Sequence, residues 1–183
     1  MKALLLIDIQ QGFEDLDHWG GQRNNPDAEE KCGTILAAFR KKELPVFHVQ
    51  HCSTDPNSPL RSGEPGNQFH LAVTPSDGEP VIQKDVNSAF IGTDLNETLK
   101  ALGIDHVVVV GLTTDHCVST TVRMAANLGF RTTIISDATA TFNKKGIDGE
   151  NYSAEVIHAT ALASLKDEFA TIMTMEELLV KMV

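Results

Sequence analysis

Four consecutive valines at residues 107–110 limit the folds open to this chain more than any other stretch. An uninterrupted run of β-branched residues is typical of a strand buried on both faces, as in a parallel sheet covered by helices. Gly111 ends the run, and a short polar turn follows. Beyond the turn, apolar residues recur at helical spacing at Val118, Val122, Ala125 and Leu128. The stretch therefore predicts a strand, a tight turn and a helix.

Cys117 lies where this turn passes into the helix. With Asp115 or Thr114 as the N-cap, its thiol falls in the first helical turn, beside unpaired backbone N–H groups at the positive end of the helix dipole. Both features favour the thiolate and predict a lowered thiol pKa, as in a nucleophilic cysteine. The alternative is a free cysteine that packs as a small hydrophobic residue.

Length and composition fit a single domain over residues 1–183. The net charge of −10 argues against a nucleic-acid partner, because such binding requires a basic surface. The three cysteines show no CxxC spacing, and the apolar run at residues 4–7 is too short for a signal peptide or a membrane span. We therefore expect a cytoplasmic protein with reduced thiols and no membrane partner.

Further strands and helices alternate along the chain. Strands are predicted at residues 3–9, 45–50, 80–83, 131–136 and 170–174, in addition to the valine run. Helices are predicted at residues 27–42, 95–102, 153–165 and 175–182, in addition to the one after Cys117. This alternation predicts a three-layer α/β/α fold with a six-stranded, mostly parallel sheet. The long irregular segment 51–79 is typical of a lid, a binding wall or a subunit contact, and residues 137–149 are predicted to be loop.

Three reactive side chains follow different strands of this predicted sheet, namely Asp8, Lys84 and Cys117. Because ligands bind outside the carboxyl ends of parallel strands, we expect the three to meet in one site. There Asp8 can take the thiol proton and Lys84 can hold the charge of the Cys117 thiolate. The backbone N–H groups of Thr113 and Cys117 can stabilise an oxyanion. The alternative is a purely structural salt bridge between Asp8 and Lys84.

Three motifs in this order resemble those of the isochorismatase-like cysteine hydrolases, and the resemblance covers nearly the whole chain. They are LLIDIQ at residues 5–10, KDVNSAF at residues 84–90 and GLTTDHCV at residues 111–118. The resemblance implies a six-stranded parallel sheet flanked by helices and a catalytic triad of Asp8, Lys84 and Cys117. It also implies a cis peptide bond before the nucleophile, here Leu112–Thr113, and assembly into a homodimer or homotetramer.

Isochorismatases that cleave a vinyl ether resemble this family, and several of them lack the cysteine nucleophile. By that resemblance, the presence of Cys117 favours hydrolysis of a C–N bond in a small amide, ureido or carbamoyl compound, through a thioester. A small-molecule substrate and no cofactor are expected. A vinyl ether hydrolase, a nicotinamidase and a non-catalytic binding relative are the alternatives. The side chains expected to contact the substrate are Gln10, Phe13, Asn87 and Phe90, with Trp19 and Tyr152 as further candidates for an apolar wall. His116 is expected to face away from the nucleophile or into a subunit contact.

A metal site is the remaining question that the motifs raise. Nicotinamidases, which resemble this family, carry a metal-binding Asp-x-His after the second strand, and the matching stretch at residues 48–51 lacks the aspartate. A zinc ion could use His51, His70 and Asp55, but these loop residues show no clear ligand spacing, so no metal is expected. A nucleotide-binding Rossmann protein is disfavoured because no G-x-G-x-x-G follows the first strand. A thiol redox sensor is a further alternative.

Overall fold

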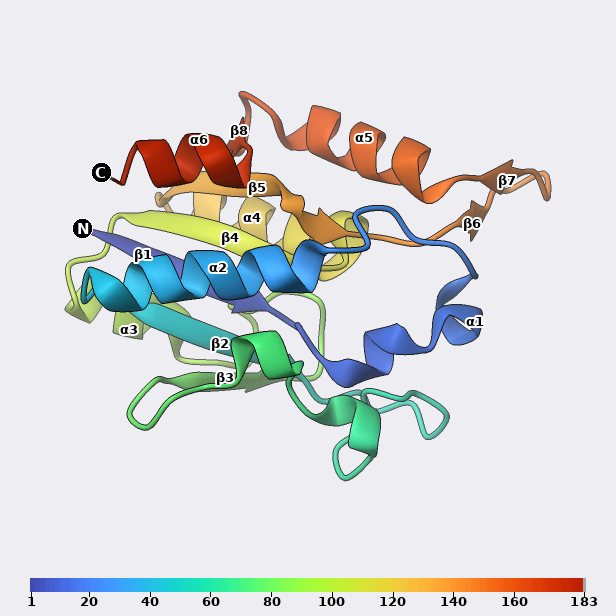
Figure 1. The fold of residues 1–183 in the computed structure, drawn as a ribbon, viewed down its shortest axis with the longest axis horizontal. Coiled ribbons are helices and arrows are strands. Elements are labelled where there is room, and N and C mark those ends of the chain that lie inside the picture. The colour runs from blue at the N-terminus through green and yellow to red at the C-terminus, as the bar shows by residue number, and fades with distance from the viewer. Residues whose placement is uncertain (183) are drawn as a thin grey trace.

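The protein is described here by a computed structural model that covers residues 1–182. Six strands form a parallel sheet in the order β3-β2-β1-β4-β5-β8 (Figure 1). They are β1 (Lys2–Ile7), β2 (Val46–His51), β3 (Val81–Lys84), β4 (His106–Leu112), β5 (Arg131–Ala140) and β8 (Thr171–Met173). The predicted six-stranded parallel α/β fold is confirmed, with the valine run in β4 at the centre.

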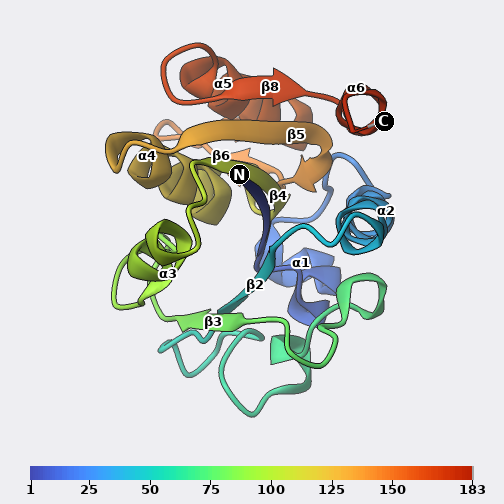
Figure 2. The same cartoon turned by 90° about the vertical axis from the view of Figure 1, so that its left-hand side faces the viewer.

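Helices cover both faces of the sheet (Figure 2). On one face lie α2 (Ala28–Lys41) and α6 (Met175–Val180), and on the other lie α3 (Leu95–Ala101), α4 (Ser119–Asn127) and α5 (Ala154–Leu165). Successive side chains of β1 point to opposite faces of the sheet and so contribute to the cores on both sides. Leu4 and Leu6 pack in the core under α2, whereas Leu5 and Ile7 pack in the core under α3 and α4. A central strand that is buried on both faces requires apolar residues at every position, as this sequence provides.

Two segments differ from the sequence prediction. Strand β5 continues to Ala140, because a register shift lets Thr139 and Ala140 pair with the end of β4. Residues 137–149, predicted to be loop, also contain the first strand of a small antiparallel hairpin, β6 (Lys144–Lys145) with β7 (Asn151–Tyr152). Strands of two residues are too short for any periodicity to reveal.

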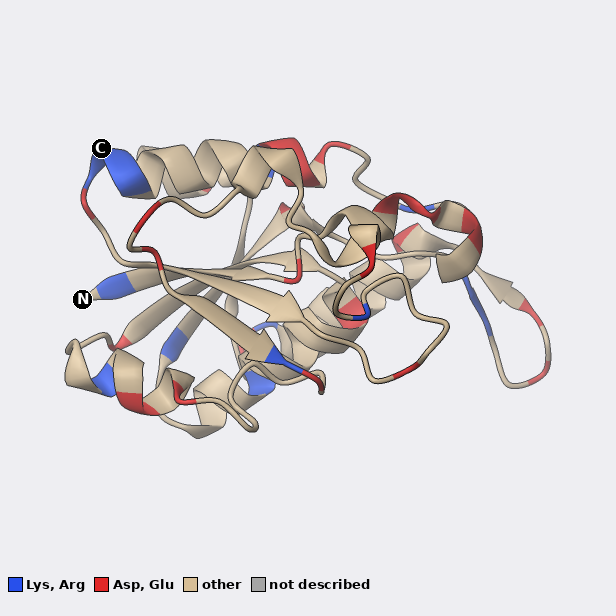
Figure 3. Cartoon of the chain, turned by 90° about the horizontal axis from the view of Figure 1, so that it is seen from below, with Lys and Arg blue, Asp and Glu red and all other residues tan. Residues whose placement is uncertain are grey.

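The carboxyl ends of the strands all reach the same edge of the sheet. The short helix α1 (Leu16–Trp19) and the β6–β7 hairpin extend beyond this edge (Figure 1). Charged residues lie mainly on helices and loops around the sheet (Figure 3). Asp8 and Lys84 are exceptions, because both side chains are fully buried at strand ends. Within residues 1–182, no helix has the length and apolar character needed to cross a bilayer.

Gly111→Ala is expected to destabilise the fold strongly. Gly111 has φ +117°, and a Cβ there would lie 2.0 Å from the carbonyl oxygen of Ile7 in the neighbouring strand. The substitution must push β4 away from β1, so we expect a loss of about 3 kcal/mol or more in the free energy of unfolding, measured by urea denaturation. Gly129→Ala is the matched control: its φ of +93° carries the same kind of strain, but nothing lies within 4 Å of the added Cβ. Equal losses in the two variants would contradict the steric explanation.

Candidate active site

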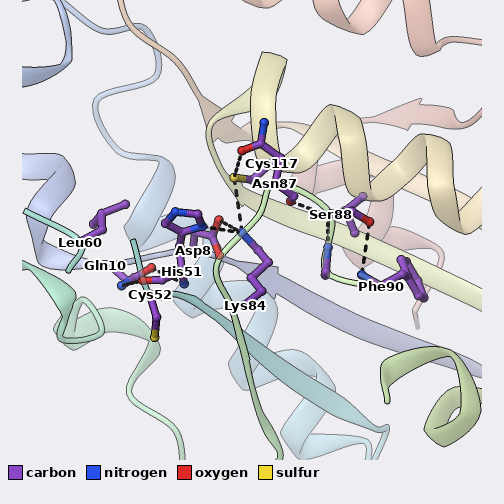
Figure 4. Close-up of polar contacts among 12 residues, drawn as sticks. Asp8, Gln10, His51, Cys52, Leu60, Lys84, Asn87, Ser88, Phe90 and Cys117 are labelled. Carbon is purple, nitrogen blue, oxygen red and sulfur yellow. Dashed lines mark hydrogen bonds and ion pairs between the residues drawn. The ribbon is translucent and has the colours of Figure 1, made fainter. Parts of the chain in front are cut away.

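Asp8, Lys84 and Cys117 meet at the carboxyl edge of the sheet, each carried there by a different segment (Figure 4). Asp8 follows β1 in a left-handed conformation with φ +51°, and Lys84 is the last residue of β3. The Lys84 ammonium donates to Asp8 Oδ2 at 2.6 Å and to Cys117 Sγ at 3.4 Å. The common carboxyl edge of the parallel strands therefore brings together three residues that are remote in sequence.

The turn that holds Cys117 differs from the predicted helix N-terminus. Thr114–Val118 form one π-helical turn ahead of α4, and no side chain caps it. The Asp115 carboxylate, expected as a cap, instead accepts hydrogen bonds from Thr141 Oγ1 at 2.5 Å and from Lys144. Cys117 thus lies inside a widened turn, a feature that is frequent at functional sites. The peptide bond between Leu112 and Thr113 is cis.

The predicted lowering of the thiol pKa is wrong for this resting structure. Burial raises the pKa of the Cys117 thiol well above its usual value, and the negative charge of Asp8 adds to that rise. The positive charge of Lys84 acts in the opposite direction but does not overcome the other two. Desolvation disfavours the thiolate more than a helix terminus favours it. The sulfur is therefore held as a neutral thiol beside the Asp8 carboxylate.

The two carboxylate oxygens of Asp8 differ in their surroundings. Its Oδ2 atom is ion-paired with Lys84, whereas its Oδ1 atom is buried without a hydrogen-bond partner among the described residues. A carboxylate oxygen of Asp8, a ring nitrogen of His51 and the sulfur of Cys117 lie within 4.8 Å of one another. A buried carboxylate oxygen without a partner is costly, so such an atom is expected where a proton will be accepted.

A cavity of about 240 Å³ opens onto the thiol and the carboxylate. Asn87, Thr113 and Phe13, all predicted as site residues, line this cavity together with Trp19. The other residues around it are His18, His51, Ser53, Asp55, Ser58, Leu60 and His116. Residues 53–60 belong to the long irregular segment after β2, so this segment forms one wall of the cavity.

Gln10, Phe90 and Tyr152 do not line the cavity, contrary to the expectation for substrate contacts and for an apolar wall. The Gln10 amide donates to the carbonyl oxygens of His51 and Asn67 and accepts the His51 N–H at 2.9 Å, so it braces the loop after β2. Phe90 packs in the core under α3, with its ring 6.0 Å from that of Phe130. The Gln10 side chain is therefore engaged by backbone groups, and the Phe90 side chain is engaged by core packing.

His51 is a site residue that the sequence argument assigned only to a possible zinc ion. Its Nδ1 atom lies 3.1 Å from Lys84 Nζ, and burial together with the Lys84 charge lowers the pKa of the ring. Because an ammonium can only donate, neutral His51 accepts this hydrogen bond through Nδ1. Its position at the end of β2 was the available signal, since the strand-end argument applies to it equally. His116, expected to face away, also lines the cavity.

The zinc alternative of His51, His70 and Asp55 is not assembled. His70 Nδ1 accepts from the Ala72 N–H at 3.3 Å, and its Nε2 atom lies 3.7 Å from Glu14. Asp8, His51 and Cys117 do cluster, but the Lys84 ammonium lies within 3.4 Å of an atom of each. One atom of each of these three residues is thus already in contact with the Lys84 cation.

Comparison with known proteins gives the family of this α/β protein. The Isochorismatase domain model matches residues 2–177, so the chain belongs to the isochorismatase family. The isochorismatase family protein YrdC of Bacillus subtilis is 48% identical over 97% of this chain and 94% of its own length. The crystal structure of a family member from Chromobacterium violaceum superposes with a TM-score of 0.95 at 43% identity, covering 99% of this chain and 93% of that one. Nicotinamidase 3 of Arabidopsis thaliana is 29% identical over 97% of this chain and 90% of its own length. Members of the family are hydrolases, including amide hydrolases.

Proposed function

We propose that this protein is a cysteine hydrolase that cleaves a C–N bond in a small amide, ureido or carbamoyl compound through a thioester on Cys117. The observation that carries the proposal is the Lys84 ammonium, which contacts the Asp8 carboxylate at 2.6 Å and the Cys117 sulfur at 3.4 Å beside an open cavity. An acid–base group, a cation and a nucleophile within contact distance are the parts that covalent acyl transfer requires.

In the acylation step, the Cys117 sulfur attacks the carbonyl carbon while its proton passes to Asp8. Lys84 stabilises the negative charge on sulfur as it develops, and backbone N–H groups of Thr113 and Cys117 hold the oxyanion. When the tetrahedral intermediate collapses, the C–N bond breaks and Asp8 returns the proton to the leaving nitrogen. A thioester and a free amine or ammonia result.

In the deacylation step, water attacks the thioester and gives a proton to Asp8. Collapse breaks the C–S bond, the proton passes from Asp8 to sulfur, and the acid product leaves. The resting thiol and carboxylate are restored. Both half-reactions use Asp8 as base and then as acid.

The protonated resting thiol favours this mechanism over a redox sensor. Sensor cysteines are exposed and have low pKa values, because oxidants react with the thiolate. Burial raises the pKa of Cys117, so the sulfur becomes strongly nucleophilic only as its proton moves to Asp8. The name of the relative nicotinamidase 3 describes a protein that acts on an amide, which supports C–N rather than vinyl ether cleavage here.

The test is a panel of small primary amides, ureido compounds and carbamates, assayed for release of ammonia or amine. We expect at least one class to be turned over, with intact-protein mass spectrometry detecting an acyl adduct after acid quenching. Peptide mapping should place the adduct on Cys117. Turnover with no adduct at any time of quenching, combined with full activity after Cys117 is alkylated, would contradict the thioester.

A further inference from the structure

The cavity contains an unbalanced negative charge. Apart from Asp8, which is neutralised by Lys84, its lining includes the carboxylate of Asp55 and, among the described residues, no lysine or arginine. Lys84, itself a member of the triad, has a fully buried side chain and does not line the cavity. Lys144 lies 2.8 Å from the cavity residue His116, but its charge is paired with Asp115. An anionic substrate would find no lysine or arginine on the described walls, which carry three histidines, His18, His51 and His116.

Asp55 is held in place by its own turn. Its Oδ1 atom accepts the Asn57 N–H at 2.9 Å, and its backbone N–H donates to Ser53 Oγ at 3.2 Å. Within the described chain, no cation lies within ion-pair distance of this carboxylate. The charge is therefore fixed beside the cavity and is free to attract a ligand.

An aromatic wall belongs to the same cavity. Phe13 and Trp19 both line it, with ring centroids 4.7 Å apart. The Trp19 indole N–H donates to the Gly12 carbonyl oxygen at 2.7 Å, and Phe142 supports both rings from behind at 6.1–6.2 Å. A fixed indole face attracts cations through its ring quadrupole. Aromatic rings and a carboxylate are together suited to an organic cation.

We propose that the substrate carries an amine, ammonium or guanidinium group away from the bond that is cleaved, and that Asp55 selects it, with Phe13 and Trp19 covering its apolar part. This inference rests on the proposed function, because it places the reacting carbonyl at Cys117. It narrows the substrate class to cationic amides or ureido compounds. It also disfavours dicarboxylate substrates, since these would bring uncompensated charge beside Asp55.

The test measures the charge preference of the cavity without requiring turnover. Cys117 is labelled with two methanethiosulfonates of similar size, one bearing trimethylammonium and one bearing sulfonate, in a Cys52→Ser background. In each reaction the cysteine sulfur attacks the sulfenyl sulfur, the S–S bond breaks and methanesulfinate leaves. We expect a rate ratio, relative to β-mercaptoethanol, that favours the cation by about tenfold at low ionic strength and decreases with salt.

Asp55→Asn keeps the acceptor for the Asn57 N–H and removes only the charge, and should lower this ratio by about fivefold. Glu64→Gln, an exposed carboxylate in the same loop that does not line the cavity, is the matched control and should leave the ratio unchanged. Equal labelling rates for the two reagents would overturn this inference alone. The same holds if the Asp55→Asn protein and the protein with Asp55 intact give equal rate ratios. A Cys117 that neither reagent reaches would overturn the proposed function as well.

Discussion

Cys117→Ala is expected to remove turnover while leaving the fold intact. Without sulfur no thioester can form, so we expect hydrolysis to fall at least about a thousandfold for any substrate found in the amide panel. The fold should persist, because the sulfur's contacts with Lys84 at 3.4 Å and with Asn87 at 3.7 Å are both long. Steady-state product release and thermal unfolding monitored by circular dichroism would measure the two effects.

Cys52→Ala is the matched control for this variant. Cys52 is half-buried beside the end of β3 and does not line the cavity, so its loss should leave turnover nearly unchanged. If Cys117→Ala retained turnover, the covalent mechanism would be excluded. Hydrolysis would then have to proceed by direct attack of water on the substrate. If both variants lost activity, the effect would lie in packing near Lys84 rather than in the nucleophile.

Lys84→Met should reduce both stability and activity. The substitution keeps a long apolar side chain but leaves the Asp8 carboxylate buried without its counter-ion, and breaking a buried pair costs about 3–5 kcal/mol. Lys84 is also the charge that lowers the pKa of Cys117, so its removal raises that pKa further. We expect slower labelling of Cys117 at a fixed pH, with the labelling profile shifted to higher pH, and at least about a hundredfold lower turnover.

Two variants separate a catalytic lysine from a structural one. Lys145→Met removes an exposed lysine in the β6–β7 hairpin and gives the same change in net charge. It should therefore change neither the stability nor the turnover. The double variant Asp8→Asn/Lys84→Met removes the uncompensated charge and should recover much of the stability without recovering turnover. Recovery of turnover in the double variant would show that Asp8 and Lys84 form only a structural salt bridge.

The limits of sequence reasoning are clearest at Gln10. Gln10 was expected to contact a substrate polar group, and regular strand alternation would place its side chain on the same side as that of Asp8. The left-handed φ of +51° at Asp8 breaks the alternation, and the Gln10 amide bonds to the loop after β2 instead. A single backbone angle thus decides which way the next side chains point, and nothing in the local sequence specifies it.

The pKa of the Cys117 thiol likewise could not be predicted from local sequence. The sequence places Cys117 near a helix start, where a local argument predicts a lowered pKa. Whether burial outweighs that effect depends on how much of the fold covers the sulfur, and here burial raises the pKa. The identities of the wall residues, such as Asp55 and Trp19, likewise depend on where irregular segments settle against the sheet.

The sequence by itself determined the parallel sheet, its central valine strand and the meeting of Asp8, Lys84 and Cys117, because buried strands leave a local apolar pattern and parallel strands end at a common edge. Only the tertiary structure decided the direction of Gln10, the protonated state of the thiol, the place of His51 beside Lys84 and the charge of the cavity. These depend on contacts between segments far apart in the chain, where side-chain direction and desolvation are set by neighbours that no local pattern specifies.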